Sequence, residues 1–291
     1  MWRVFHQMRL LLWRAVRLFP VQIQNYRVGP DAPLLLIAGP CLAESLDLCR
    51  RVASHMSELC FSRGINYVFK ASFDKANRTS IGGARGPGIE SGLEILAAIK
   101  SEFAVPVTTD VHESYQAEIL APVVDLLQIP AFLCRQTDLL LACGEQAAKW
   151  NGAVNIKKGQ FLKPEGMAHA LAKVRSTGCQ NVLLTERGTT FGYDSLVVDF
   201  RGLEIMREMA PVCLDATHSV QKPGGGGDKT TGERRFVPAL VRAACAVGVD
   251  ALFIETHPDP ESAPSDGPNM VPLEEMAHLL DSALQIRRVC A

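Results

Sequence analysis

One unit recurs along almost the whole chain: a short apolar run ending in polar or charged residues, a loop, and a helical pattern of about 10 to 18 residues. The eight predicted strands are residues 34–38, 67–70, 107–109, 126–129, 154–157, 182–185, 212–215 and 252–255. The helices predicted to follow them are residues 44–62, 90–101, 114–121, 137–149, 164–176, 201–209, 234–247 and 272–288. Ser45, Ser114 and Thr137 are typical N-caps, and Pro164 suits a first helical turn.

Eight such units predict an α/β chain folded as a (β/α)8 TIM barrel, with buried, apolar strands and an active site at their carboxyl ends. Residues 21–28, with a turn at 29–31, predict an N-terminal β-hairpin before the first core strand. An open doubly wound sheet is the alternative, but no GxGxxG follows the first strand, and polar residues leave all eight strands. Residues 224–230 depart from a Walker A loop because Asp228 stands where its last glycine is needed, and we interpret them as a mobile lid.

The first 27 residues contain five arginines and no acidic residue, among many apolar and aromatic side chains. Such a segment is typical of a targeting sequence or a membrane-surface helix. Its apolar runs are far shorter than the roughly 20 residues of a spanning helix, so we expect no stable membrane insertion. We expect residues 1–20 to be a basic extension, dispensable or disordered, and residues 21–291 to form a single barrel domain.

The charge balance and the cysteines indicate which binding partners and which cellular compartment to expect. The chain has 30 basic and 31 acidic side chains in 291 residues, which argues against a nucleic-acid partner. Its nine cysteines are scattered without a CxxC pair, and an odd number in a chain of this length indicates reduced thiols. We therefore expect a cytoplasmic protein.

Basic side chains follow several predicted strands. Residues 68–80, VFKASFDKANRTS, place Lys70, Lys75 and Arg78 where the second strand ends. Alone, such a cluster is more often a solvated loop, but Lys157 and Arg187 leave other strands at the same barrel mouth. Several cations in one low-dielectric cleft fit a ligand with two phosphates, or with a phosphate and a carboxylate. Other polar residues expected at this mouth are Asp110, His112, Gln128, Arg135, Asn155, Lys158, Gln160, Asp215 and His257.

A second set at this mouth could share one metal: Cys41, His218, Glu255 and Asp266. A thiolate, an imidazole and two carboxylates suit a borderline divalent ion such as Fe²⁺, Zn²⁺ or Mn²⁺. Composition alone favours an inert, buried Cys41. The four residues lie far apart in the sequence, and only the barrel would bring them together.

Eight motifs carry a resemblance to a known family: KASFDKANRTS at 70–80, RGPG at 85–88, TDVHE at 109–113, QIPAFLCRQTDLL at 128–140, NIKKGQF at 155–161, ERGTTFGYDSLVVD at 186–199, DATHSVQ at 215–221 and ETHPDPESAPSDGPN at 255–269. Over roughly residues 34–280 the chain closely resembles the 3-deoxy-D-manno-octulosonate 8-phosphate synthases. The resemblance implies a (β/α)8 barrel, usually a homotetramer, that condenses phosphoenolpyruvate with D-arabinose 5-phosphate and water. The eight-carbon sugar acid phosphate that it makes, together with inorganic phosphate, serves lipopolysaccharide synthesis.

The resemblance also implies residue roles. Lys70, Lys75, Lys157 and Arg187 match groups that grip phosphoenolpyruvate, and residues 77–79 match a segment that holds arabinose 5-phosphate and reaches a neighbouring subunit's site. The implied catalytic set is Lys70, Lys75, Asp110, Lys157 and His218. The implied substrate-binding set is Asn77, Arg78, Thr79, Gln128, Arg135, Gln160 and Arg187.

A metal-independent branch of that family has Asn where this chain has Cys41. With His218, Glu255 and Asp266 also matched, the resemblance implies the metal-dependent branch, with Fe, Zn, Mn or Co as cofactor. Two departures lie outside the matched sites: residues 82–84 replace a bulkier polar trio, and the first thirty residues have no counterpart.

Three alternatives stay open at this point. A related synthase uses erythrose 4-phosphate and tends to have lysine-proline-arginine in the KANRTS segment, so Ala76 and Asn77 favour the five-carbon sugar. Lys70 could form a Schiff base, as strand-end lysines of barrel aldolases do, although the neighbouring cations are better suited to anions. A non-catalytic sugar-phosphate-binding barrel would keep the cations but lose the metal ligands.

Overall fold

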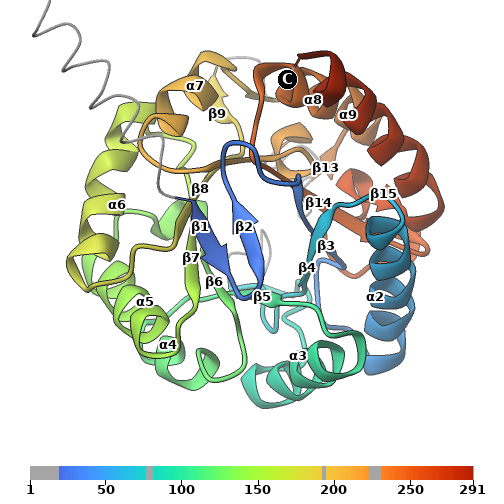
Figure 1. Ribbon diagram of the computed structural model, residues 1–291. Coiled ribbons are helices and arrows are strands. Elements are labelled where there is room, and N and C mark those ends of the chain that lie inside the picture. Colours follow the sequence, from blue (N-terminus) through green and yellow to red (C-terminus); the bar gives the residue numbers. More distant parts are fainter. Residues whose placement is uncertain (1–19, 77–80, 192–194, 223–230, 291) are drawn as a thin grey trace, which may run out of the picture.

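The computed structural model describes residues 20–76, 81–191, 195–222 and 231–290. Its core is a closed parallel barrel in the order β11-β8-β7-β6-β5-β4-β3-β14, completed by pairing of β11 with β14 (Figure 1). The strands are β3 (Leu35–Gly39), β4 (Asn66–Lys70), β5 (Val107–Asp110), β6 (Leu126–Ile129), β7 (Ala153–Lys157), β8 (Val182–Glu186), β11 (Val212–Asp215) and β14 (Ala251–His257). The predicted (β/α)8 barrel is confirmed.

Eight α-helices of the described residues surround the barrel (Figure 1). They are α2 (Leu46–Phe61), α3 (Ile89–Phe103), α4 (Ser114–Leu120), α5 (Thr137–Lys149), α6 (Met167–Ser176), α7 (Arg201–Arg207), α8 (Val237–Val247) and α9 (Met276–Cys290). Short 3-10 turns are η1 (Ala131–Leu133), η2 (Pro164–Gly166), η3 (His218–Val220), η4 (Arg234–Phe236), η5 (Pro260–Ser262), η6 (Gly267–Asn269) and η7 (Leu273–Glu275).

The first residues of the helices confirm two of the four predicted helix-start residues, Ser45 and Pro164. Ser45 caps α2, since its side chain accepts a hydrogen bond from the Leu48 N–H. Pro164 opens the 3-10 turn that leads into α6. The other two caps were wrong by one residue, because Ser114 and Thr137 are already helical. Glu113 caps α4 instead, in a reciprocal capping box with Gln116.

The predicted N-terminal hairpin is present and closes one end of the barrel. Strands β1 (Val21–Ile23) and β2 (Tyr26–Val28) pair antiparallel, and Figure 1 shows them lying across the end of the barrel that faces the viewer. The buried side chains of this hairpin pack on an inner cluster of the barrel that includes Leu35, Val68 and Phe253. A larger apolar cluster fills the space between barrel and helices. The hairpin therefore seals the amino ends of the strands.

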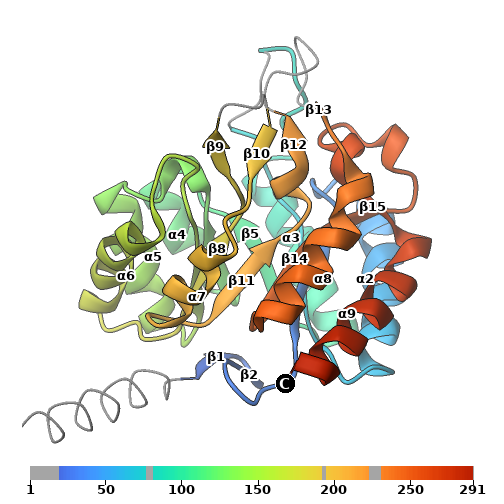
Figure 2. The ribbon, with the colours of Figure 1, turned by 90° about the horizontal axis from the view of Figure 1, so that it is seen from above.

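Additional strands gather at the opposite, carboxyl end, as Figure 2 shows from the side. Hairpin β9 (Thr189–Phe191) and β10 (Ser195–Val197) follows β8, hairpin β12 (Gln221–Lys222) and β13 (Thr231–Gly232) follows β11, and β15 (Val271–Pro272) extends from β14. These pieces were not predicted. The lid interpretation of residues 224–230 and the extension up to residue 19 lie outside the described residues. No helix among the described residues has the length and apolar character needed to cross a membrane.

Candidate active site

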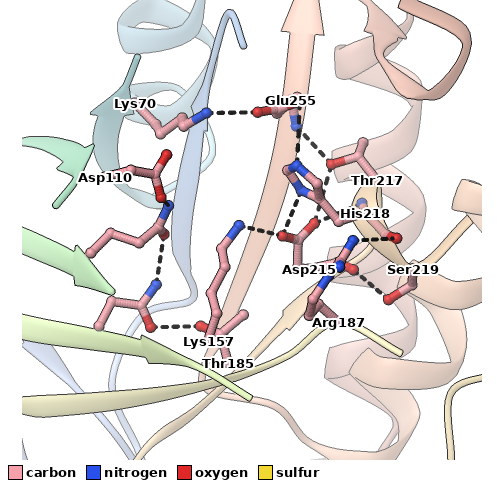
Figure 3. A network of polar contacts seen from close by, with 12 residues as sticks. Lys70, Asp110, Lys157, Thr185, Arg187, Asp215, Thr217, His218, Ser219 and Glu255 are labelled. Atoms are coloured by element: carbon pink, nitrogen blue, oxygen red, sulfur yellow. Dashed lines mark hydrogen bonds and ion pairs between the residues drawn. The ribbon is translucent and has the colours of Figure 1, made fainter. Parts of the chain in front are cut away.

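Polar side chains at the carboxyl ends of neighbouring strands form a continuous hydrogen-bonded row (Figure 3). Thr185 Oγ1 donates to Asn155 Oδ1 at 2.6 Å, and Asn155 Nδ2 donates to Gln128 Oε1 at 2.9 Å. Gln128 Nε2 then donates to Asp110 Oδ1 at 2.8 Å. The barrel register causes this, because Asp110, Gln128 and Asn155 are direct partners on β5, β6 and β7. The row fixes the orientation of each amide and holds the Asp110 carboxylate in place.

Two buried lysines face two buried carboxylates at this mouth (Figure 3). Lys70 Nζ lies 2.6 Å from Glu255 Oε1, and Lys157 Nζ lies 2.6 Å from Asp215 Oδ2. Lys157 Nζ also lies 3.7 Å from the centre of the Phe253 ring, a cation–π distance. At the end of β3, Gly39 allows the strand to pass close to the Lys70 backbone, where a Cβ would collide with the Lys70 carbonyl. The sequence thus places two buried lysine side chains at the carboxyl ends of the strands.

The charges of this cluster stabilise one another. Burial opposes ionisation of Glu255, but Lys70 and His218 outweigh it, so the pKa of Glu255 lies below its ordinary value. Burial likewise opposes ionisation of Asp215, but His218 and Lys157 outweigh it and hold the pKa of Asp215 well below its ordinary range. Burial is the largest single effect and lowers the pKa of Lys70, but Glu255 and the other acidic groups around it together raise the net pKa above its ordinary value. The directions of these pKa shifts favour the charged forms of Lys70, Glu255 and Asp215.

Three of the four predicted metal ligands meet at one point. One ligand atom each from Cys41, Glu255 and Asp266 lies within 4.8 Å of the others. Cys41 Sγ is 3.1 Å from Asp266 Oδ2. Glu255 Oε2 is buried and has no hydrogen-bond partner among the described residues. An orphaned carboxylate oxygen beside a thiol and a second carboxylate fits a divalent cation.

His218, the fourth predicted ligand, lies at the edge of this group. Its Nε2 is 3.8 Å from Glu255 Oε2, and its Nδ1 is 2.7 Å from Asp215 Oδ2. A carboxylate on one ring nitrogen is the arrangement that orients a metal-binding histidine through the other. Burial, followed by Glu255, raises the pKa of the Cys41 thiol well above its ordinary value. A bound cation would have to displace that proton.

Other predicted site residues are placed around this centre. Lys75 Nζ is 3.5 Å from Asp266 Oδ2. Arg187 is buried and donates through Nη2 to the His218 carbonyl at 3.1 Å and to Gln221 Oε1. Gln160 is buried, and its Oε1 has no hydrogen-bond partner among the described residues.

Some predicted residues are not brought to the centre. Arg135 is exposed on the loop after η1, so the structure leaves its predicted substrate contact untested. Asn77, Arg78 and Thr79 lie outside the described residues. Lys158 is occupied by Glu186 Oε2, the Leu162 carbonyl and Thr189 Oγ1, and is a structural cation.

Sequence reasoning missed partners that hold the site. Asp215 was noted only as a strand-end residue, although it binds both Lys157 and His218. Ser72 Oγ donates to Asp110 Oδ2 at 2.6 Å, and Gln221 Nε2 donates to Asp266 Oδ1 at 2.9 Å. Phe253, whose ring contacts Lys157 Nζ, is an apolar residue that was also missed. It lies two residues before Glu255 on β14 and so shares its inward face, a signal that strand periodicity offers.

Comparison with known proteins agrees with this geometry. The family model described as DAHP synthetase I family matches residues 18–288. A protein of Synechococcus sp. named 2-dehydro-3-deoxyphosphooctonate aldolase is 54% identical over 268 residues, 92% of this chain and 93% of that protein. Proteins of the same name from Granulibacter bethesdensis and Brucella canis are 56% and 54% identical, covering 89% and 92% of this chain and 91% and 96% of their own lengths.

These matches span the barrel from the hairpin to α9, and therefore include every strand that contributes to the cluster of lysines and carboxylates. The match extends over nearly the full length of the relatives. The chain belongs to the DAHP synthetase I family, among its 2-dehydro-3-deoxyphosphooctonate aldolases.

Proposed function

We propose that this enzyme condenses phosphoenolpyruvate with D-arabinose 5-phosphate and water to 3-deoxy-D-manno-octulosonate 8-phosphate and inorganic phosphate, the reaction of the 3-deoxy-D-manno-octulosonate 8-phosphate synthases. The observation that carries the proposal is the set of buried cations at one barrel mouth, Lys70, Lys157 and Arg187. A cleft with several buried cations favours a polyanionic substrate. The product would serve lipopolysaccharide biosynthesis.

The bonds that form and break in this reaction suggest a role for each of these side chains. C3 of phosphoenolpyruvate attacks the sugar aldehyde, water adds at C2, and phosphate leaves by cleavage of its bond to C2. Lys157 and Arg187 are suited to hold the phosphate and carboxylate while charge shifts between them. Asp110, whose carboxylate accepts hydrogen bonds from Gln128 and Ser72, is our candidate for the group that accepts a proton from the attacking water.

A Schiff base at Lys70 is the rival mechanism. It requires a neutral amine, whereas Glu255 at 2.6 Å stabilises the ammonium form. We expect borohydride added with either substrate to leave the protein mass unchanged. A covalent adduct on Lys70 would overturn the electrostatic role.

We further propose that the enzyme is metal-dependent, with Cys41, His218, Glu255 and Asp266 holding the ion. The donor set suits Fe²⁺, Zn²⁺, Mn²⁺ or Co²⁺. When bound, such an ion would supply Lewis acidity that lowers the pKa of a water or polarises the aldehyde. Glu255 has one oxygen on Lys70 and the other without a hydrogen-bond partner among the described residues, so it is able to serve both groups.

The first experiment measures phosphate release from phosphoenolpyruvate with a panel of aldose phosphates. Arabinose 5-phosphate should exceed erythrose 4-phosphate by about a hundredfold in kcat/KM, since a lost contact to an anchored phosphate costs about 2 to 4 kcal/mol. Arg78→Ala should raise KM for the sugar more than KM for phosphoenolpyruvate. Equal turnover of the two sugars would reject the assignment of the acceptor.

The second experiment removes the metal. Exhaustive chelation should abolish turnover, and one equivalent of Mn²⁺, Co²⁺, Fe²⁺ or Zn²⁺ should restore it. Cys41→Ala should lose both metal and activity, while Cys41→Asn should keep measurable metal-free activity if an amide there holds the water. Full activity of metal-free protein, confirmed by elemental analysis, would contradict metal dependence and leave the synthase reaction standing.

We also propose a cytoplasmic homotetramer. A cytoplasmic location is supported by the nine cysteines, which all lie in the described ranges and are all unpaired. The assembly is a proposal from the family resemblance, in which residues 77–79 reach a neighbouring site. Light scattering at assay concentrations measures it, and a fully active monomer would contradict it.

A further inference from the structure

One side chain lies between the anion-binding arginine and the proposed metal centre. Gln221 opens β12, and its pairing with Gly232 of β13 fixes its backbone. Its Oε1 accepts a hydrogen bond from Arg187 Nη2, and its Nε2 donates to Asp266 Oδ1 at 2.9 Å. The amide therefore connects β8 to the loop after β14.

The orientation of this amide follows from the chemistry of its neighbours. A guanidinium only donates and an ionised carboxylate only accepts, so the Gln221 oxygen must face Arg187 and its nitrogen must face Asp266. Asp266 Oδ1 is then occupied, and Oδ2 is the oxygen turned to Cys41 Sγ at 3.1 Å and Lys75 Nζ at 3.5 Å. Gln221 thus selects which oxygen Asp266 presents to the centre.

The same arginine also supports the histidine of the centre. Arg187 Nη2 donates to the His218 carbonyl at 3.1 Å, and the backbone N–H of Gln221 donates to that same carbonyl. One guanidinium thereby contacts the backbone of His218 and, through the side chain of Gln221, the carboxylate of Asp266. Because the Gln221 amide is hydrogen-bonded to both Arg187 and Asp266, a displacement of one of these side chains is transmitted to the other.

We propose that Gln221 is a positioning residue that couples Arg187 to Asp266, so that the anion site and the metal centre share one support. The inference rests on the proposed function, because it takes Asp266 as a metal ligand and Arg187 as an anion contact. Binding at one site then changes affinity at the other by the same factor. Gln221 itself touches neither the substrate nor the ion.

The test measures metal affinity of the full-length, metal-free protein by titration with Co²⁺, following the thiolate-to-cobalt absorption of Cys41. Gln221→Met keeps the side-chain volume and removes both hydrogen bonds, so Kd for Co²⁺ should rise about tenfold. KM for phosphoenolpyruvate should change less than Kd for Co²⁺, because Arg187 remains. The matched control Gln146→Met makes the same substitution on α5, outside the site, and should bind Co²⁺ as the wild type does.

A double-mutant cycle separates coupling from simple loss of a contact. In the wild type, Arg187→Met should change Kd for Co²⁺. In the Gln221→Met background it should change Kd by a factor that differs at least about threefold, since coupled residues are not additive. Additive changes would overturn the inference, and so would a Gln221→Met protein that binds Co²⁺ as tightly as the wild type.

The outcomes distinguish this inference from the proposed function. A wild-type protein that binds no Co²⁺ would reject the metal centre and, with it, the coupling. A wild type that binds Co²⁺ together with an unaffected variant would reject the coupling alone. If Gln221→Met fails to fold by circular dichroism, Gln221→Asn keeps an amide that is one methylene too short to bridge both partners, and the same weakening is expected.

Discussion

Both ends of the barrel carry buried carboxylates, but their partners differ. At the amino end, Asp125 Oδ2 accepts from the Val107 N–H and Asp250 Oδ2 accepts from the Val212 N–H, each at 2.9 Å. From neighbouring helices, Lys100 forms an ion pair with Asp125 and Arg207 forms one with Asp250. At the carboxyl end, Asp215 and Glu255 face buried ammonium and imidazole groups instead.

The difference separates structural carboxylates from functional ones. A carboxylate that accepts from strand amides satisfies backbone donors and joins neighbouring strands. A carboxylate that pairs with side-chain cations instead holds those cations at the mouth, where an anion could also bind them. The pKa values differ in direction as well: burial, the dominant effect, raises the pKa of Asp250, whereas the cations around Asp215 lower its pKa.

The strongest test replaces one lysine at each end by Met. Lys157→Met should reduce kcat/KM by about a thousandfold, because a buried cation aimed at a developing charge is lost. Lys100→Met removes the matching ion pair at the amino end and should leave kcat/KM within a few-fold. Steady-state kinetics compares the two variants, with melting curves to confirm folding. Equal losses of activity would remove the distinction between the two ends.

Asp215→Asn should destabilise the fold by about 3 kcal/mol, because Lys157 and His218 lose a buried partner. The pKa of Asp215 is depressed in the folded state, so its contribution is fully present above its ordinary value of 3.8. That contribution disappears as the pH falls through the depressed folded pKa. Denaturant unfolding from pH 3 to pH 7 should show the wild type and the variant converging toward acid.

Asp250→Asn should change stability by only about 1 kcal/mol at neutral pH, because the amide oxygen still accepts from the Val212 N–H. Here the folded pKa is raised, so the wild type loses stability relative to the variant as the pH rises above the ordinary value of 3.8. The same unfolding series measures this opposite slope. A slope of the same sign as that of Asp215 would contradict the contrast.

The smallest effect is expected from the amino-terminal extension. Pro20, the first described residue, leads into the hairpin at the end of the barrel away from the mouth (Figure 2). Deleting residues 1–18 should therefore leave kcat within a few-fold. A soluble but inactive truncation would show that the segment contributes to the site.

The strand positions could be predicted from the sequence because most strands, such as β3 and β14, contain a short apolar run between a helix and a polar exit. The pairwise geometry of the site could not be predicted in the same way. Whether Asn155 faces Gln128 depends on the stagger between β6 and β7, which leaves no periodic signal in either strand. The contact of Gln221 with Asp266 joins the short strand β12 to the loop after β14, and it follows from no pattern within either segment.

The sealed end of the barrel has a practical consequence for attaching other molecules to this enzyme. Arg287, near the end of α9, donates to the carbonyls of Val249 and Ala32, so the carboxyl terminus is held beside the hairpin (Figure 2). Strand β1 lies at the same end of the barrel. An affinity tag, a fluorescent partner or a surface linker fused after α9 would therefore lie at the sealed end of the barrel, away from the catalytic opening. Immobilised in this way, every molecule presents its mouth to the solution.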